Sequence, residues 1–406
     1  MFLGGLFPKE REQEIIKNSK GAVQNAANTL QWNMIRALES GLGKPVTVLN
    51  APYIGSFPQR YRKLFMKGGR FCHVPGAKDE SIRFCNLAYW KYYSIYFHLR
   101  KALKRWACEG KPSDKAVVAY ALTGNHLKLF RFLKKRFPEI RTILAVPDLP
   151  EFMNLGQENK GTLFHWLKKL DVTFIYRHLN SADRFILLTE AMNERVRASS
   201  ENYTVMEGIA PAPYEDSAEK FSEKTMLYTG GLAETYGVVD LCEAFHRTAN
   251  PEYRLILCGS GQAENAVKQY AAKDRRISYL GLIERKKARI LQCQASVLVN
   301  PRGDEGAFTA YSFPSKILEY MSSGTPVMMR KLKGIPPEYM EHCCPIVSDS
   351  IDGFSNEIDL VLSKSSEELA ALGADAKEFV TKQKGIEQQG RKLIRLLEDE
   401  PGGKKA

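Results

Sequence analysis

The residues with the clearest chemical potential lie in one block of the second half of the chain, Phe313-Pro314-Ser315-Lys316-Ile317-Leu318-Glu319. Pro314 suits the start of a helix, and the Ser315 side chain is expected to cap it. A helix that begins there offers free backbone N–H groups to an anion, and Lys316 adds a formal charge. The block predicts a site for a phosphate group. The alternative is an ordinary solvated helix surface bearing Lys316 and Glu319.

Glycine turns follow two expected strands in the same half. Tyr228-Thr229 leads into Gly230-Gly231, and Leu257-Cys258 leads into Gly259-Ser260-Gly261. Glycine lets the backbone adopt positive φ and approach a ligand closely. Glycine turns are also common wherever strands end, so each turn alone is weak evidence. Together with Arg302, which follows a further strand, they favour a nucleotide diphosphate.

Short apolar runs alternate with helical stretches along almost the whole chain. The first half is expected to open with a strand ending at Gly4-Gly5, followed by a helix within Val23–Leu38. The further expected strands are Val46–Asn50, Val117–Ala121, Thr142–Val146, Phe185–Thr189, Met226–Thr229, Tyr253–Cys258, Ile277–Leu280, Ala295–Val299 and Pro326–Met329. Strands separated by helices imply parallel sheets covered on both sides. The expected fold class is α/β, with two Rossmann-like doubly wound domains facing a cleft.

The charge is unevenly distributed along the 406 residues. Residues 1–210 hold 33 Lys and Arg against 18 Asp and Glu, whereas the remainder has a net charge of −2. The first half therefore meets an anionic partner. We expect an N-terminal domain at 1–209, a linker at 210–224, a second domain at 225–384, a helix at 385–400 and a disordered tail at 401–406.

The second half resembles the donor domain of family 4 glycosyltransferases, which are retaining enzymes of GT-B architecture. The resemblance runs from about Thr225 to Val347. It is carried by Tyr228–Leu232, Tyr236-Gly237-Val238, the Gly259–Gly261 turn, Tyr279–Ile283 and the block Phe313–Val327. The Phe-Pro-Ser-Lys form of that block resembles a capsule- or exopolysaccharide-type branch. GT-B chains also cross back at their C-terminus, which suits the helix at 385–400.

The resemblance implies a hexosyltransferase that uses a nucleotide diphosphate sugar, most often UDP-linked, as co-substrate. It places Glu319 on the ribose, Lys316 on the diphosphate, and Gly4 and Gly5 on the acceptor side. The remaining donor contacts would come from Gly230, Gly231, Gly259, Ser260, Gly261, Leu282, Ile283, Arg302, Tyr311, Ser312, Phe313, Pro314 and Ser315. The chain departs from the family where an earlier glutamate falls on Tyr311, and where an Arg and a Lys fall on Gly231 and Tyr236. Lys316 and Arg302 are the basic residues best placed to replace them.

Cleavage of a sugar–diphosphate bond develops negative charge on the leaving phosphate, which cations and N–H dipoles stabilise. No D-x-D sequence is present to hold a divalent cation, so no metal requirement and no permanently bound cofactor are expected. In the family, the departing phosphate oxygen takes the acceptor proton, and no side-chain base is needed. Asp148, between two prolines, is the candidate catalytic acid or base on the acceptor side, with Asp304 and Glu305 as alternatives. A turn or a solvated loop would equally explain these three.

The segment Leu87–Trp106 mixes aromatic residues with cations and reads LAYWKYYSIYFHLRKALKRW. With basic residues of the 60–70 segment it could form a surface for anionic lipid, where each Lys or Arg contributes about 1 kcal/mol. The alternative is a buried helix with cations at its edge. The first interpretation suits a saccharide or polyprenyl-diphosphate acceptor in cell-surface polysaccharide synthesis, such as capsule or lipopolysaccharide. It also suits a cytoplasmic protein that is peripheral on the inner face of the membrane.

Three other classes are less consistent with the sequence. A nucleic-acid binder would suit the pI of about 9.2, but no recognition motif is present. A dinucleotide oxidoreductase lacks the third glycine of its turn, where Glu264 stands, and no P-loop occurs. A non-catalytic GT-B scaffold stays open at this point. The eight scattered cysteines form no metal-binding pattern and are expected to be ordinary thiols.

Overall fold

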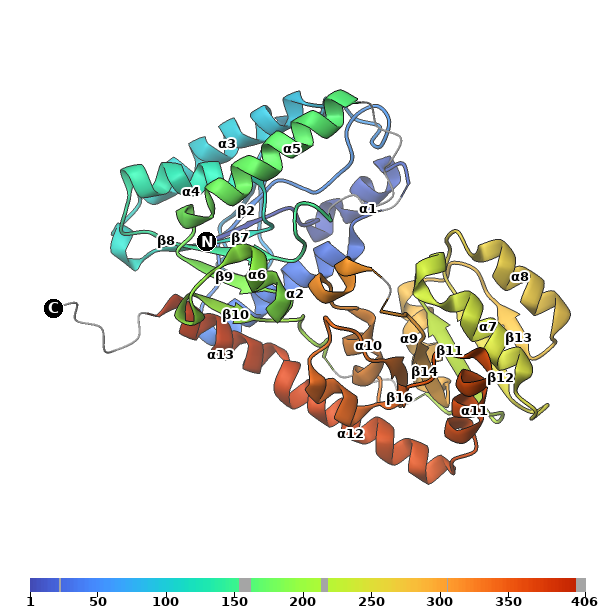
Figure 1. Cartoon of the computed structure of the whole chain (residues 1–406). Helices are drawn as coiled ribbons and strands as arrows, with labels where there is room; N and C mark the ends of the chain where they lie inside the picture. Colours follow the sequence, from blue (N-terminus) through green and yellow to red (C-terminus); the bar gives the residue numbers. More distant parts are fainter. Residues whose placement is uncertain (22, 153–161, 213–217, 305, 399–406) are drawn as a thin grey trace. The chain divides into compact units, whose positions relative to one another are not determined.

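The computed structural model describes residues 1–21, 23–152, 162–212, 218–304 and 306–398 (Figure 1). The chain divides into two compact units. Unit 1 comprises Met1–Ile209 together with Ile386–Ala406, and unit 2 comprises Ala210–Gly385. The tail expected at 401–406, and residues 213–217 of the expected linker, lie outside the described residues. Since each unit has its own sheet and core, each is described by itself.

Unit 1 is built on one mostly parallel sheet with the strand order β10-β9-β8-β7-β1-β2-β5-β4. Successive strands are added in opposite directions from β1: β2 lies on one side of it, and β7, which comes later in the chain, lies on the other. Loops that follow β1 and β7 therefore diverge at the carboxyl edge, where such sheets bind ligands. The strands are β1 (Phe2–Gly4), β2 (Val48–Asn50), β4 (Gly69–Phe71), β5 (Asp79–Ser81), β7 (Ala116–Tyr120), β8 (Arg141–Val146), β9 (Arg184–Leu187) and β10 (Tyr203–Val205).

One stretch of unit 1 departs from the expected alternation of strand and helix. Strand β4 pairs antiparallel with β5, and a separate antiparallel pair joins β3 (Phe65–Met66) to β6 (Phe84–Cys85). These antiparallel pairs between residues 65 and 85 were not predicted from the sequence. These strands are only two or three residues long and carry glycines and charges, so the apolar periodicity that revealed the other strands is absent.

Helices cover both faces of the unit 1 sheet (Figure 1). One face carries α2 (Asn25–Leu42) and α13 (Ile386–Leu397), whose Met34, Leu38, Leu393 and Leu396 pack with β1, β2, β7, β8 and β9. Gly41 and Gly390 let these two helices approach closely, because an added Cβ would lie 2.4 Å from Ile394 or 2.5 Å from the Ala37 carbonyl. The other helices are α1 (Lys9–Asn18), α3 (Trp90–Ala107), α4 (Gly124–Arg136), α5 (Thr162–Arg177) and α6 (Asn193–Val196).

Unit 2 has a six-stranded, wholly parallel sheet in the order β13-β12-β11-β14-β15-β16. When the strands of this unit are numbered along the chain, this is the doubly wound order 3-2-1-4-5-6. Strands 2 and 3 are added on one side of strand 1, and strands 4 to 6 are added on its other side. The switch point therefore lies between β11 and β14. The strands are β11 (Thr225–Thr229), β12 (Arg254–Cys258), β13 (Ile277–Tyr279), β14 (Val297–Asn300), β15 (Val327–Arg330) and β16 (Cys344–Ile346).

The core of unit 2 explains why its sheet is stable. Leu241, Phe245, Phe354 and Ile358 pack with the buried residues of β11 and β12 on one face of the sheet. Burying a large apolar side chain contributes roughly 1.5–3 kcal/mol. The helices of this unit are α7 (Val238–Arg247), α8 (Glu264–Lys273), α9 (Arg285–Gln294), α10 (Lys316–Ser322), α11 (Ile351–Leu362) and α12 (Ser366–Lys384).

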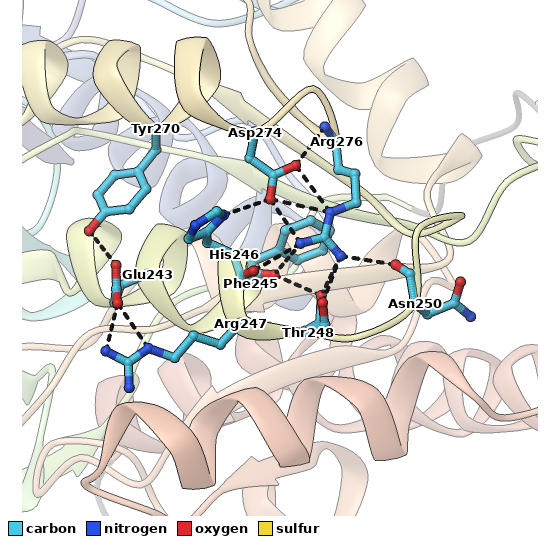
Figure 2. Close-up of polar contacts among 9 residues, drawn as sticks. All are labelled: Glu243, Phe245, His246, Arg247, Thr248, Asn250, Tyr270, Asp274 and Arg276. Atoms are coloured by element: carbon cyan, nitrogen blue, oxygen red, sulfur yellow. Dashed lines mark hydrogen bonds and ion pairs between the residues drawn. The ribbon is translucent and has the colours of Figure 1, made fainter.

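A buried polar network fastens α7 to the amino end of β13 (Figure 2). The Arg276 guanidinium donates to the backbone carbonyls of His246 at 3.0 Å, Thr248 at 2.8 Å and Asn250 at 2.9 Å. It also pairs with Asp274 at 2.8 Å, and Asp274 accepts a hydrogen bond from His246. A cation at the end of a helix satisfies its last carbonyls and opposes its dipole. The network lies at the amino edge of the sheet, so its role is to hold the fold.

Candidate functional site

The predicted ligand residues of unit 2 gather at the carboxyl edge of its sheet, around the switch point. Gly230 and Gly231 follow β11, Gly259–Gly261 follow β12, and Arg302 follows β14. An open α/β sheet binds ligands in the crevice outside these strand ends, because the loops to either side lead to helices on opposite faces. The topology therefore brings together Gly230 and Arg302, which lie 302 − 230 = 72 positions apart in the sequence.

The two glycine turns are packed directly against each other. The Gly230 N–H donates to the Cys258 carbonyl at 3.0 Å, and the Leu232 N–H donates to the Ser260 carbonyl at 3.0 Å. Gly259 has φ of +143°, and a Cβ on it would lie 1.7 Å from the Gly230 carbonyl oxygen. A side chain there would force the turns apart. Gly259 therefore lets the two turns pack against each other at this edge of the sheet, whereas Gly231 is exposed.

Because Gly259 is tightly packed and Gly231 is exposed, an alanine should destabilise the protein at the first position and have little effect at the second. Gly259→Ala is expected to lower the free energy of unfolding by roughly 2–4 kcal/mol, because strain at positive φ and the steric overlap add. Gly231→Ala is the matched control, since its Cβ would meet the Tyr236 ring at an ordinary 3.5 Å. Urea denaturation of both variants would measure the difference. Equal stability of the two would contradict this account of the turn.

Arg302 is held between two aromatic rings. Its guanidinium carbon lies 5.3 Å from the centre of the Tyr236 ring and 5.1 Å from that of Phe308. Nη2 donates to the Ser312 hydroxyl at 3.2 Å, while the buried Nε has no hydrogen-bond partner in the described part of the chain. Burial lowers the pKa of Arg302, and the nearby tyrosines and Asp304 oppose that shift. A cation held in position by two aromatic rings suits an anionic ligand.

The block around Ser315 forms the short helix α10, which begins at Lys316. Ser315 occupies the cap position but has helical φ and ψ, and its side chain makes no capping hydrogen bond. The prediction that Ser315 caps the helix through its hydroxyl was therefore wrong. Pro314 provides the first acceptor instead, taking the Ile317 N–H at 3.0 Å. The backbone N–H groups of Ser315 and Lys316 have no acceptor within the described residues.

Lys316 and Glu319 form a salt bridge one turn apart, with the ammonium 3.3 Å from both carboxylate oxygens. Lys316 is 42% exposed and Glu319 is 16% exposed. Gln292 of α9 orients the carboxylate, because its Nε2 donates to Glu319 at 3.0 Å and to Thr229 Oγ1 at 2.9 Å. The buried Tyr320 hydroxyl binds the Thr229 backbone at 2.8 and 3.0 Å. The carboxylate is thereby fixed to the end of β11.

The other predicted donor residues differ in what their side chains do. Phe313 is buried against the Tyr339 ring at 5.2 Å, which is a packing role. Leu282 is 82% exposed, and Ile283, Tyr311 and Pro314 are half-buried. Ser260 and Gly261 are exposed at the turn. Only some of the block is therefore shaped to contact a ligand.

The two acidic alternatives to Asp148 are Asp304 and Glu305. Asp304 accepts a hydrogen bond from Thr309 Oγ1 at 2.5 Å and lies 3.6 Å from the Lys333 ammonium. It therefore organises its own loop, in place of the solvated position that was one expectation for it. Glu305 lies outside the described residues.

The predicted acceptor-side residues lie at the carboxyl edge of the unit 1 sheet. Gly4 and Gly5 end β1 and are buried. The Gly5 N–H donates to Gln31 at 2.7 Å, and the Tyr53 ring lies against its Cα, leaving no room for a Cβ. Asp148 follows β8 and is exposed, yet the desolvating surroundings raise its pKa to about 6. At neutral pH it is mainly a carboxylate that can accept a hydrogen bond.

The described residues hold no group of three or more His, Cys, Asp and Glu side chains that could bind a metal ion. None of the eight cysteines forms a disulfide bond within the described residues. Among the helices in the part of the chain that the structure describes, none has the length and apolar character needed to cross a bilayer.

Most of unit 2 matches the model of a known protein family. Residues 223–372 match the model of the family described as glycosyl transferases group 1. The chain is a glycosyltransferase. No curated protein sequence matches it.

Solved structures of similar fold cover the whole chain of this glycosyltransferase. The lipopolysaccharide outer core galactosyltransferase WaaB, in its apo form, is 14% identical with a TM-score of 0.59, and 98% of each chain is covered. A trehalose-6-phosphate protein of E. coli bound with UDP-2-fluoro glucose is 11% identical with a TM-score of 0.63, covering 97% of this chain and 98% of the other. Anabaena Alr3699/HepE in complex with UDP is 13% identical with a TM-score of 0.55, covering 98% of both. These likenesses confirm the predicted GT-B fold.

The candidate site also contains residues that sequence reasoning missed. Gln292 donates hydrogen bonds to both Glu319 and Thr229. Phe308 and Tyr236 both place their rings against the Arg302 guanidinium. A glutamine inside an otherwise ordinary helix gives no pattern to detect. Tyr236 stands where the family that the sequence resembles often has a cation. Its ring instead lies against Arg302, which brings a cation to the same neighbourhood from another strand.

Proposed function

We propose that this glycosyltransferase moves a hexose from a UDP-linked donor to a saccharide or lipid-linked acceptor with retention of anomeric configuration. Unit 2 binds the donor and unit 1 binds the acceptor. The bond between the anomeric carbon and the diphosphate breaks, and the acceptor oxygen bonds to the same face of that carbon. The departing phosphate oxygen takes the acceptor proton. The product would enter cell-surface polysaccharide.

One observation carries the donor assignment: two cations and an oriented carboxylate gather at the switch point of unit 2. Glu319, fixed by Gln292, is proposed to bind the ribose hydroxyls. Lys316 and Arg302 are proposed to bind the diphosphate and to stabilise the charge that grows on it. UDP is supported as the nucleotide because proteins of similar fold hold UDP or UDP-2-fluoro glucose. On the acceptor side, the Asp148 carboxylate is proposed to accept a hydrogen bond from an acceptor hydroxyl.

A thermal-shift screen against UDP, GDP, dTDP and their hexose derivatives tests this assignment. A ligand at about 100 times its dissociation constant stabilises the native state by about 2.7 kcal/mol, so one nucleotide should raise the melting temperature clearly. Glu319→Ala should remove most of that shift, because the ribose loses its acceptor. The matched control is Glu252→Ala, an exposed glutamate before β12. A full shift in Glu319→Ala, or no shift with any nucleotide, would sink the proposal.

We further propose that unit 1 attaches the enzyme peripherally to the inner face of an anionic membrane. Trp90, Tyr93 and Phe97 occupy one stripe of α3, and each is about two-thirds exposed (66%, 70% and 65%). The buried-helix alternative does not hold for these aromatics, since Leu99 and Leu103 face the core instead. Exposed Trp166 lies on α5, on the same side of the sheet (Figure 1). Aromatic side chains flanked by cations anchor proteins at lipid interfaces.

Vesicle flotation measures this attachment. The protein should float with vesicles that contain anionic phospholipid, and binding should weaken strongly at high salt because screening shortens the reach of the cations. Replacing Trp90, Tyr93 and Phe97 with serine should reduce binding at least tenfold. Leu360→Ser, which removes an exposed apolar side chain from α11, is the control. Equal failure of the wild type with neutral and anionic vesicles would remove the idea.

A further inference from the structure

Two adjoining hollows in unit 1 have no assigned role. They have volumes of about 450 and 480 Å³ and share the segment Gly68–Arg70 and Ser81. Gly69 pairs with Ser81, and Ser81 pairs with Asn50 at the end of β2. The hollows therefore lie at the carboxyl edge of the sheet, the edge that also carries Gly4 and Gly5. We propose that these two hollows, together called the groove, bind a phosphate or diphosphate group of the acceptor. The inference rests on the proposed function, with unit 1 as the acceptor unit.

The groove has an excess of cations that internal ion pairs do not neutralise. Its lining contains seven Lys and Arg side chains and three glutamates. Glu14 pairs with Lys63 at 2.7 Å, and Glu80 pairs with Arg105 at 2.5 Å. Lys67, Arg70 and Lys101 are exposed and have no carboxylate within ion-pair distance among the described residues. Arg70 lines both hollows, so its guanidinium can reach a ligand in either.

The backbone leaves this space open. Gly69 has nothing within 4 Å of the position that a Cβ would take, so no side chain fills the groove above it. Gly68 packs tightly against the segment 81–83 at the end of β5, where a Cβ would meet the Arg83 nitrogen at 2.8 Å. A recessed backbone flanked by cations suits an anion with three or more acceptor oxygens, because Arg binds phosphate through two parallel hydrogen bonds.

The first hollow also has an apolar side, which narrows the ligand further. Pro8, Met66, Phe71 and Phe65, which is 67% exposed, line it together with Lys67 and Arg70. A free inorganic ion would gain nothing from these side chains. A phosphate joined to a sugar ring or to a prenyl chain would engage both sides, since aromatic faces contact sugar C–H groups and prenyl methyl groups alike. The groove therefore selects an amphipathic phosphate.

Calorimetric titration of the full chain with inorganic pyrophosphate, glucose 1-phosphate, farnesyl diphosphate and farnesol tests the proposal. The wild type should bind the phosphate probes and not farnesol. The double variant Lys67→Gln/Arg70→Gln should raise the dissociation constant at least tenfold and leave UDP binding unchanged. Lys135→Gln/Arg136→Gln, which removes two exposed cations from the far end of α4, is the matched control. Tighter binding of farnesyl diphosphate than of glucose 1-phosphate indicates a lipid acceptor, and the reverse order indicates a soluble sugar phosphate.

Lysine acetylation with mass spectrometry locates the bound probe, since pyrophosphate can also occupy the donor site. Pyrophosphate should protect Lys67 and Lys101 from acetylation and leave Lys135 reactive. This protection should persist in Lys316→Ala, where the donor site is impaired. The proposal is overturned if groove and control variants bind pyrophosphate equally, or if protection occurs at Lys316 alone. Loss of nucleotide binding with intact Lys67 protection would instead contradict the donor assignment.

Discussion

Lys316→Ala is expected to lower the turnover of sugar transfer by about a hundredfold to a thousandfold. A preorganised donor aimed at charge that develops in the transition state is worth about 2.7–4 kcal/mol. Lys316 is the first residue of α10, and its ammonium lies 3.3 Å from the Glu319 carboxylate. Because charge on the phosphate grows as the bond breaks, the loss should fall mainly on kcat.

Release of nucleoside diphosphate from the hexose donor, measured at saturating donor, checks this result. Lys316→Arg should recover part of the activity, since it keeps the charge but changes the position of the donor groups. Lys273→Ala, at the exposed end of α8, is the control for a general charge effect. A kcat within about threefold of the wild type in Lys316→Ala would show that another group bears the leaving phosphate. A rise in KM alone would indicate ground-state binding only.

Arg276→Ala is expected to lower the free energy of unfolding by about 3–5 kcal/mol. The Arg276 side chain is 11% exposed and its partner Asp274 is 7% exposed. Removal of the guanidinium leaves a buried carboxylate and the last carbonyls of α7 without their donor, and breaking a buried pair carries a cost of this size. Calorimetric melting should show one transition falling sharply. Arg275→Ala, the exposed neighbour, is the control.

The same network predicts how stability depends on pH. Burial alone would raise the pKa of Asp274, but hydrogen bonds from Arg276 and His246 outweigh it and hold the pKa well below its usual value. A depressed carboxyl pKa stabilises the native state above about pH 4, the unfolded value, and the contribution is lost as pH falls toward the native value. Asp274→Asn should therefore unfold with less pH dependence between about pH 4 and pH 2. An unchanged slope would refute the role given to Asp274.

Much of the fold could be predicted because its strands are apolar and regularly spaced. The expected strands Met226–Thr229 and Thr142–Val146 lie within one residue of β11 and β8. The α/β class and the GT-B architecture followed from that alternation and from the resemblance. The strands β4 and β5 escaped prediction because they are short, polar and stabilised by an antiparallel pairing that only tertiary structure provides.

The residues of the candidate site could be proposed from the sequence, but the contacts between them could not. Glycine and charge patterns indicated Gly259, Arg302 and Lys316, because turns that need glycine and residues that carry a formal charge can be recognised in the sequence. The Glu319 carboxylate, however, is oriented by Gln292, which lies 27 positions away on another helix. The Ser315 cap failed for a related reason: a favourable residue type permits a capping bond but does not fix the backbone angles that the bond requires.

The packing of α13 on α2 has a consequence for biosynthesis. Unit 1 is discontinuous in the chain, since its last helix is translated after all of unit 2. On the ribosome, unit 2 can complete its core while the α2 face that receives Leu393 and Leu396 is still bare. A fragment that stops at Ile209 would leave that apolar surface open to aggregation. To express unit 1 by itself, residue 209 should therefore be joined to residue 386 by a short connection, in place of a simple truncation.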